Sequence, residues 1–261
     1  MRIALGIEYD GSAYSGWQLQ DDVATVQGVL EDALANVANT PIRVITAGRT
    51  DTGVHATGQV VHLETDVERS DFSWVRGTSR YLPDDVTVLW AKHVDDEFHA
   101  RFSAIERSYQ YLILNRKERP AILHKKVTWD YRSLDISLMQ TAASALVGRH
   151  DFNAYRAVAC QAKSPVRDLR ELSIERHGDF VVINARADAF LHHMIRNIAG
   201  VLSSIGAGER PPAWAEEVLL SCDRTRGGVT APPDGLYLNQ ILYPENFRIP
   251  TIRNRSWMFG L

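Results

Sequence analysis

One acidic side chain lies in a short, glycine-containing connection that has little structural use for it. Residues 48–56 read Gly-Arg-Thr-Asp-Thr-Gly-Val-His-Ala and connect two apolar segments that are predicted as strands. Gly48 and Gly53 permit backbone angles that other residues avoid, so the connection can bend sharply. Arg49 places a fixed positive charge two residues before the carboxylate of Asp51. These residue types suit a plain hairpin poorly and predict an active-site loop.

Composition places the chain among ordinary globular proteins. Its 261 residues are 45% hydrophobic and 23% charged, which fits one large domain or two smaller ones. No apolar run approaches the roughly 18 residues of a membrane helix, and the first residues alternate like a strand, unlike a signal peptide. We therefore expect a cytoplasmic protein with no membrane partner. Cys160 and Cys222 match no zinc or iron–sulfur spacing and are predicted to be free thiols.

Four histidines are candidates for a metal site, but their spacing in the sequence does not favour one. His55 and His62 stand seven residues apart across a turn. Adjacent His192 and His193 would point about 100° apart on a helix, which is awkward for shared ligation. We expect structural or hydrogen-bonding roles for all four and no bound metal.

The net charge of -3 is distributed unevenly along the chain, which contains one basic segment. Residues 101–132 hold eight Lys or Arg against three acids, so this segment carries +5 and the rest of the chain -8. Tyrosine and tryptophan interleave with these cations, a composition suited to phosphate contact and base stacking. A solvated face above strand aromatics would have the same composition, and both interpretations stay open at this point. The cations are Arg101, Arg107, Arg116, Lys117, Arg119, Lys125, Lys126 and Arg132.

The elements that must position these residues follow the order β-α-β-β-α-β twice. The first half has strands at 2–9, from 41, from 58 and at 86–94, with helices at 25–38 and 71–81. The second has strands at 108–115, 169–176, 180–187 and 236–243, with helices at 135–147 and 190–205. The pattern predicts an α+β protein of two ferredoxin-like halves, 1–103 and 104–261, around a mostly antiparallel sheet. Long irregular stretches at 10–24, 152–166 and 224–235 are candidates for binding.

The motif at residues 48–56 is similar to the catalytic motif of the TruA family of tRNA pseudouridine synthases. Further blocks resemble those of the family, in the same order and across nearly the whole chain: 9–18, 98–104, 107–111, 148–152, 190–197 and 235–238. Two departures are visible. Thr52 stands where the family commonly has Ala and adds only a small hydroxyl. Ser108 stands where a second Arg is frequent, which bears on RNA affinity more than on chemistry.

The resemblance implies the pseudouridine synthase fold and a role for each site residue. The reaction breaks the glycosidic bond of uridine, turns the uracil and joins its C5 to the ribose without net redox change, so no cofactor is expected. Asp51 is implied to be the nucleophile, and a carboxylate with a reference pKa of about 3.9 is already ionised at neutral pH. Arg49 and Arg196 are the candidate cations beside it, and the family favours Arg196. Tyr109 is implied to stack on the target base and Leu236 to pack on the uracil face.

The order of bond changes stays open, because attack by Asp51 at the sugar C1′, addition at the uracil C6 and elimination through a glycal-like intermediate all fit. Tyr109 could also help to remove the C5 proton. The four residues Asp51, Tyr109, Arg196 and Leu236 come from both halves of the chain, which predicts a site in a cleft between the halves.

Chemistry on a stacked base requires its extrusion, at a cost of a few kcal/mol that RNA contacts must offset. We expect recognition by shape and phosphate. The predicted tRNA contacts are Arg101, Arg107, Lys125, Lys126, Arg156, Lys163 and Arg167. The resemblance implies uridines at positions 38 to 40 of the anticodon stem-loop as targets, and a homodimer in which one RNA touches both subunits.

Two other classes of protein compete with this interpretation. A passive RNA-binding module would share the fold and the basic aromatics, but would not depend on Asp51. A carboxylate-dependent nucleoside hydrolase would need a second acid opposite the first, and residues 50–63 contain no acid except Asp51.

Overall fold

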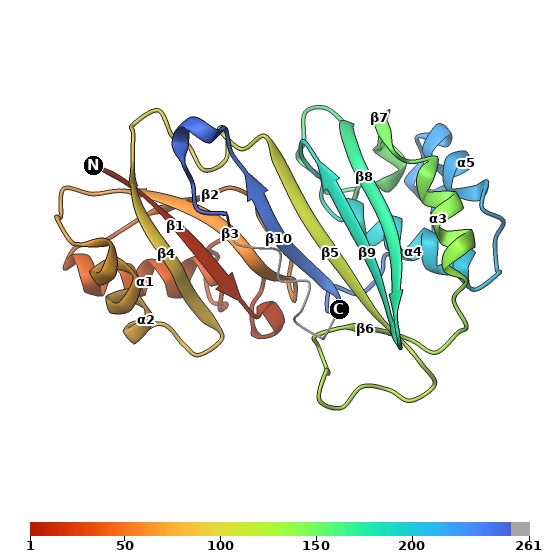
Figure 1. The fold of residues 1–261 in the computed structure, drawn as a ribbon, viewed down its shortest axis with the longest axis horizontal. Coiled ribbons are helices and arrows are strands. Elements are labelled where there is room, and N and C mark those ends of the chain that lie inside the picture. The colour runs from red at the N-terminus through yellow and green to blue at the C-terminus, as the bar shows by residue number, and fades with distance from the viewer. Residues whose placement is uncertain (252–261) are drawn as a thin grey trace. The chain divides into compact units, whose positions relative to one another are not determined.

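The structure, a computed structural model, describes residues 1–251 and consists of two compact units (Figure 1). Unit 1 contains residues 1–106 and the described residues from Tyr237 onward, and unit 2 contains Arg107–Leu236. The expected halves, 1–103 and 104–261, differ from these units because the last described segment packs with unit 1. Residues 252–261 of the expected second half lie outside the described residues. Within residues 1–251, no helix is both long and apolar enough to cross a membrane.

Unit 1 has the strand and helix order expected of a ferredoxin-like half. Its elements are β1 (Arg2–Tyr9), α1 (Val26–Ala38), β2 (Val44–Thr46), β3 (His55–Glu64), a π-helical turn (Ser73–Gly77) continued by α2 (Thr78–Tyr81), and β4 (Val86–Val94). Helix α1 begins as predicted, because the Thr25 side chain accepts a hydrogen bond from the Gly28 N–H. Its Leu30, Ala33 and Leu34 are buried, as their helical spacing predicts.

Strand β3 is the centre of unit 1. It pairs antiparallel with β1 along one edge, and β1 pairs antiparallel with β4. Along its other edge, β3 pairs antiparallel with β2 near Leu63 and parallel with β10 (Leu236–Leu242) near His55. Every β3 residue except Glu64 is buried, so the strand that follows the acidic loop is held on both edges.

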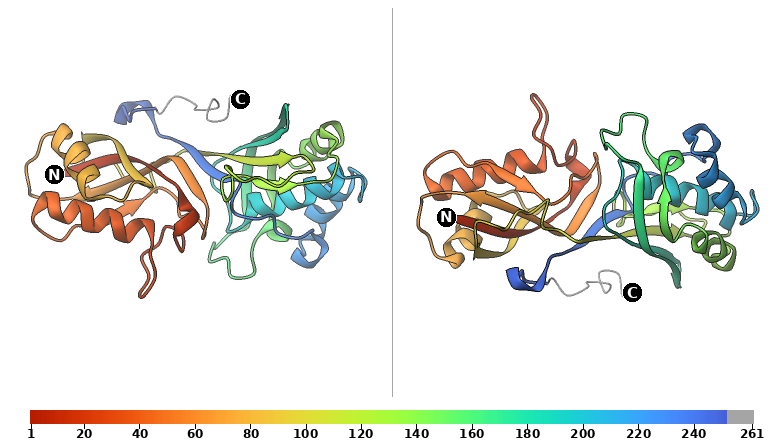
Figure 2. Two further views of the ribbon diagram at one scale, coloured as in Figure 1. Left: turned by 90° about the horizontal axis from the view of Figure 1, so that it is seen from below. Right: turned by 90° about the horizontal axis from the view of Figure 1, so that it is seen from above.

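Unit 2 consists of mostly antiparallel strands and of helices that pack against them. Its elements are β5 (Glu106–Asn115), β6 (Thr128–Asp130), α3 (Ile136–Ser144), β7 (Gly148–Asp151), β8 (Val166–His177), β9 (Phe180–Ala187), α4 (Met194–Gly206) and α5 (Trp214–Ser221). β5 pairs with β9, β9 with β8 and β8 with β7, all antiparallel, while β6 lies parallel to β5. In both views of Figure 2, helices α3, α4 and α5 gather on one side of these strands. The expected α+β class with a mostly antiparallel sheet is confirmed.

Three expectations for unit 2 need correction. Helix α4 begins at Met194 and not at 190, because His193 takes a left-handed conformation (φ 62°) that separates the preceding turn from the helix. Helix α3 ends at Ser144, short of the expected 147. Helix α5 was not predicted, because it has only 8 residues and follows a Pro-Pro pair that reads as a loop.

Candidate active site

The acidic loop, residues 47–54 between β2 and β3, is held by backbone hydrogen bonds to the irregular segment 10–18. The Trp17 N–H donates to the Thr50 carbonyl at 3.0 Å, and the Gly53 N–H donates to the Tyr14 carbonyl at 3.3 Å. The loop also closes on itself, since the Val54 N–H donates to the Asp51 carbonyl at 3.1 Å. Asp51 therefore lies in a turn whose backbone is fixed from both sides.

Glycines allow this close approach. Gly16 has φ +89°, and a Cβ atom there would lie 2.8 Å from the Thr50 carbonyl oxygen. A Cβ on Gly11 would lie 2.0 Å from the Val54 carbonyl oxygen. Gly53 has φ +78°, a backbone angle that favours glycine, whereas Gly48 is not in the left-handed region.

Buried side chains of β1 and β3 hold the acidic loop from beneath. The hydroxyls of Tyr9 and Thr50 share a hydrogen bond of 2.7 Å, and both residues are buried. The Gln59 side chain donates to the Gly48 carbonyl at 2.7 Å. Burial raises the pKa of the Tyr9 hydroxyl above its usual range, so the hydroxyl stays protonated at neutral pH. Sequence reasoning noted the block 9–18 but gave no role to Tyr9, and no local pattern connects Tyr9 to Thr50.

The side chains of the acidic loop differ in their exposure. Asp51 is half-buried, Arg49 and Thr52 are exposed, and Thr50 is buried. The hydrogen bonds of the loop backbone restrain the position from which the Asp51 side chain extends. This is the arrangement that a positioned nucleophile needs.

His55 and His62 have the hydrogen-bonding roles that their sequence context predicts. His55 Nδ1 accepts from the Gly11 N–H at 3.1 Å, and its ring stacks on Tyr237 with centroids 4.6 Å apart. His62 Nδ1 accepts from the Ala100 N–H at 3.1 Å. Burial lowers the pKa of His62 to about 4, so its ring is neutral at physiological pH.

In unit 2, Tyr109 differs from the core tyrosine two residues along the same strand. Tyr111 is fully buried, and its hydroxyl bonds the Thr128 hydroxyl at 2.6 Å and the Pro232 carbonyl at 2.8 Å. Tyr109 is only partly buried, and its ring meets the edge of Phe190 at 5.1 Å and 79°. An aromatic ring that is oriented by a neighbour but not enclosed suits stacking on a base.

Arg196 and Leu236 are brought together with β5 by the segment 231–236. Arg196 Nε donates to the Ala231 carbonyl at 2.8 Å, and the Ala231 N–H donates to the Arg196 carbonyl at 3.0 Å. The Leu112 N–H of β5 donates to the Gly235 carbonyl at 2.8 Å. Leu236 is buried at the start of β10. These contacts within unit 2 place Arg196 of α4 beside the segment that ends at Leu236, and the Pro232 carbonyl of the same segment accepts the hydrogen bond from Tyr111.

The predicted tRNA-binding cations fall into two groups. Arg107 donates to the Asp188 carbonyl at 2.8 Å, and Arg167 donates to the Ser164 carbonyl at 3.0 Å, so both stabilise backbone of unit 2. The others are exposed or half-buried at the surface: Arg101, Lys125, Lys126, Arg156 and Lys163. Sequence alone could not separate the two groups, because the partners of Arg107 and Arg167 are backbone carbonyls.

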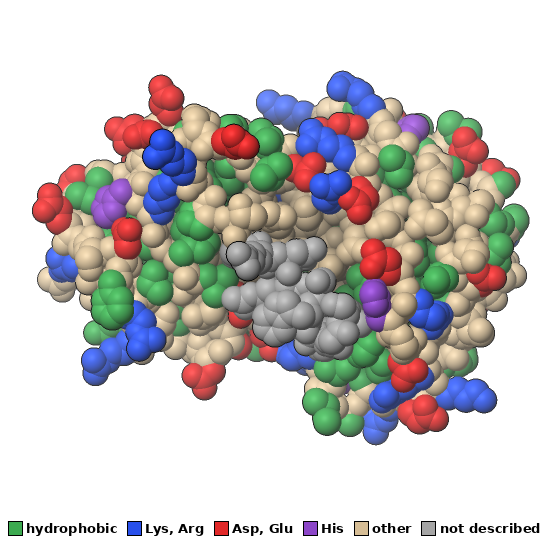
Figure 3. Space-filling model, viewed as in Figure 1, with side chains coloured by type: hydrophobic (Ala, Val, Ile, Leu, Met, Phe, Trp, Pro, Cys, Tyr) green, Lys and Arg blue, Asp and Glu red, His purple; other side chains and the backbone are tan. Residues whose placement is uncertain are grey.

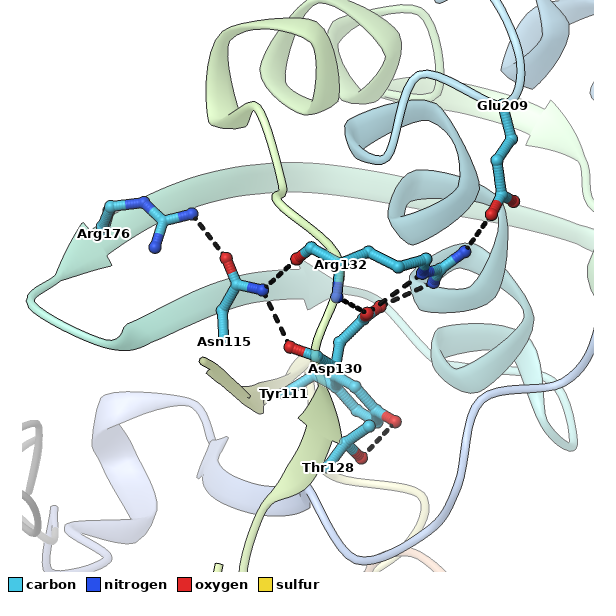
Figure 4. A network of polar contacts seen from close by, with 7 residues as sticks. All are labelled: Tyr111, Asn115, Thr128, Asp130, Arg132, Arg176 and Glu209. Carbon is cyan, nitrogen blue, oxygen red and sulfur yellow. Dashed lines mark hydrogen bonds and ion pairs between the residues drawn. The ribbon is translucent and has the colours of Figure 1, made fainter. Parts of the chain in front are cut away.

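The basic loop, residues 116–127 between β5 and β6, carries most of the surface cations of the positive segment. Lys and Arg side chains gather over this connection (Figure 3). Its two ends are joined by a polar network, shown in Figure 4, in which the Asn115 side chain donates to the Asp130 carbonyl at 2.9 Å. Arg132 contacts the Asp130 carboxylate at 2.6 Å and Glu209 at 2.6 Å. These carboxylates raise the pKa of Arg132, and Arg132 lowers the pKa of Glu209.

Known proteins resemble this chain along nearly its whole length. A family model described as tRNA pseudouridine synthase matches residues 6–103 and 142–244. The protein named tRNA pseudouridine synthase A of Nitrosococcus oceani is 58% identical over 97% of both chains. The proteins of that name from Pseudomonas aeruginosa and Coxiella burnetii are 56% and 53% identical over 95% of this chain, and over 88% and 95% of their own lengths.

Among solved structures, a chain of a Cbf5-Nop10-Gar1 complex is similar at 10% identity with a TM-score of 0.34, over 77% of this chain and 54% of that one. A likeness this low carries no argument. The family model and the relatives above 50% identity show the family of this chain. This chain belongs to the tRNA pseudouridine synthase family, whose reaction is the isomerisation of uridine in tRNA.

Proposed function

We propose that this chain converts uridines at positions 38 to 40 of the tRNA anticodon stem-loop to pseudouridine, with Asp51 as the nucleophile. The observation that carries the proposal is the acidic loop itself. Its backbone donates a hydrogen bond to the Tyr14 carbonyl and accepts one from the Trp17 N–H, while Asp51 is half-buried. A carboxylate on a loop held in this way is suited to attack on a nucleotide whose base has been extruded from its stack.

Residues of unit 2 complete the proposed chemistry. Arg196 supplies the cation that pairs with the Asp51 carboxylate, and the Ala231 carbonyl bond supports this role because it restrains the guanidinium. Arg49 is the second cation. Tyr109 stacks on the uracil, which its partly exposed ring permits, and Leu236 contributes an apolar face.

The RNA is proposed to contact the surface cations of unit 2. The basic loop offers Lys125 and Lys126, and the loop before β8 offers Arg156 and Lys163. Arg101, at the end of unit 1, adds a further charge. Such contacts supply affinity through phosphates and offset the cost of extruding the base. The enzyme is proposed to act in the cytoplasm as a homodimer, with one RNA in contact with both subunits.

The test uses unmodified tRNA carrying tritium at C5 of uridine, with tRNA binding measured in parallel. Asp51→Asn should bind tRNA normally and release no tritium. Asp66→Asn, an exposed acid elsewhere in unit 1, serves as the matched control and should behave as wild type. Tritium release by Asp51→Asn at the wild-type rate would refute the nucleophile, and release of free uracil would indicate a hydrolase.

Position is tested with tRNAs that retain uridine at only one of positions 38, 39 and 40. Each should release tritium, and a tRNA with none of the three should not. Tyr109→Phe separates two roles for Tyr109, because it retains the stacking ring and removes the hydroxyl. Turnover that survives in Tyr109→Phe but not in Tyr109→Ala would assign stacking and exclude proton transfer.

A further inference from the structure

We propose that the buried hydroxyl pair of Tyr9 and Thr50 is a positioning device for Asp51, and that catalysis depends on it. This inference rests on the proposed role of Asp51 as nucleophile. The two hydroxyls lie 2.7 Å apart, and Thr50 is the residue immediately before Asp51. Tyr9 is 3% exposed and Thr50 7%, so the bond forms away from water.

The Tyr9–Thr50 bond restrains the Thr50 side chain, in addition to the hydrogen bond that restrains the Thr50 backbone. The Thr50 carbonyl is already held by the Trp17 N–H at 3.0 Å, which restrains one side of the peptide before Asp51. The Thr50 side chain bonds the last residue of β1, whose position is set by pairing with both β3 and β4. Together the two bonds restrain both the side chain and the carbonyl of Thr50, and so the peptide that joins Thr50 to Asp51.

A second contact connects the pair to the start of the acidic loop. The Gln59 side chain lies 3.5 Å from the Tyr9 hydroxyl and donates to the Gly48 carbonyl at 2.7 Å. Gln59 is fully buried in β3. Gly48 and Thr50, which stand three positions and one position before Asp51, are thus connected to the same buried hydroxyl, so we expect a change at Tyr9 to be transmitted to the acidic loop.

The expected result is a loss of turnover without a loss of binding. Tyr9→Phe removes the bond partner of the buried Thr50 hydroxyl, and Thr50→Val leaves the Tyr9 hydroxyl with only its 3.5 Å contact to Gln59. Either change should let the Thr50–Asp51 peptide turn. A displacement of about 1 Å at a reacting group costs about a hundredfold in rate, so we expect kcat to fall by about ten- to a hundredfold. The KM for tRNA should stay within about twofold, because RNA affinity comes mainly from phosphate contacts.

Two controls separate positioning from general destabilisation. Tyr243→Phe removes a buried tyrosine hydroxyl that donates to the Ala100 carbonyl at 2.7 Å in the same unit. Thr57→Val removes a buried threonine hydroxyl that donates to Asn239 at 3.0 Å. Each control should lose as much thermal stability as its partner variant and keep the wild-type kcat. Thr50→Ser, which keeps the hydroxyl, should retain kcat within about threefold of wild type.

The experiment measures kcat, KM and melting temperature for these variants and for the double variant Tyr9→Phe/Thr50→Val. A shared bond predicts that the double variant is no slower than the slower single variant. Multiplied losses in the double variant, control variants as slow as Tyr9→Phe, or an inactive Thr50→Ser would each overturn the inference. An active Asp51→Asn would instead refute the proposed nucleophile, so the two failures are distinguishable.

Discussion

Gly16→Ala is predicted to damage both the stability and the activity of this enzyme, because the added Cβ would collide with the backbone of the acidic loop. Gly16 has φ +89°, and an added Cβ would lie 2.8 Å from the Thr50 carbonyl oxygen. A left-handed conformation costs an L-residue about 1 to 2 kcal/mol. The contact is with backbone, which cannot rotate away, so the acidic loop must shift by several tenths of an ångström and the Trp17 hydrogen bond must lengthen.

Gly178→Ala separates the two contributions. Gly178 lies in the β8–β9 turn with φ +58°, and nothing lies within 4 Å of its added Cβ. This control carries the conformational cost without the contact, so its free energy of unfolding should fall by about 1 kcal/mol. Gly16→Ala should lose about 2 to 4 kcal/mol, because a weakened hydrogen bond and a steric contact add to the conformational cost.

Urea unfolding measures the stability difference, and tritium release from C5-labelled tRNA measures the activity. We expect kcat of Gly16→Ala to fall by at least about tenfold at a temperature where the variant is folded, since Thr50 directly precedes Asp51. Gly178→Ala should keep the wild-type kcat. Equal unfolding midpoints for the two variants, together with a normal kcat for Gly16→Ala, would refute the claim that this contact sets the loop.

Acid should destabilise the enzyme through His62, because its folded pKa of about 4 lies below its unfolded value. The folded state then binds fewer protons than the unfolded state between about pH 6.5 and 4, so stability falls by about 2 to 3 kcal/mol as pH drops through this window. Urea unfolding of His62→Gln should show a smaller fall, and an identical pH dependence would contradict the assignment. Lys125→Ala and Lys126→Ala should each weaken tRNA binding. In a plot of the logarithm of the tRNA binding constant against the logarithm of the salt concentration, each should make the slope shallower by about one unit. Arg69→Ala, an exposed cation of unit 1, is their control and should leave that slope unchanged. Dialysis against a chelator should leave activity intact, and a loss that only metal ions restore would show that a metal is required.

Local patterns in the sequence predicted most elements because their causes are local. The apolar spacing of α1 and its Thr25 cap need only neighbouring residues, and the β8–β9 hairpin needs only a Gly-containing turn between two apolar runs. The start of α4 was wrong because a left-handed His193 has no reliable local signal. Helix α5 was missed because a single short helix after two prolines is stabilised by packing and not by its own pattern.

The candidate site likewise has features that the sequence predicts and features that only the fold decides. The identity of Asp51 as the acid of interest follows from the sequence alone, since glycines, a cation and one carboxylate fall within nine residues. Which cations are exposed and which bind backbone, as Arg107 does, was decided only by the fold. The roles of Tyr9 and Gly16 were likewise invisible in the sequence.

The sequence by itself therefore determined the family, the order of the elements and the chemistry available to the acidic loop, because residue types and short-range spacing carry that information. The tertiary structure alone decided what holds the loop still. The Tyr9–Thr50 bond joins residues 41 positions apart, and β10 reaches β3 from the far end of the chain, with Tyr237 opposite His55. Such contacts exist only after the strands pair. The sequence therefore identifies Asp51, but only the folded sheet positions it.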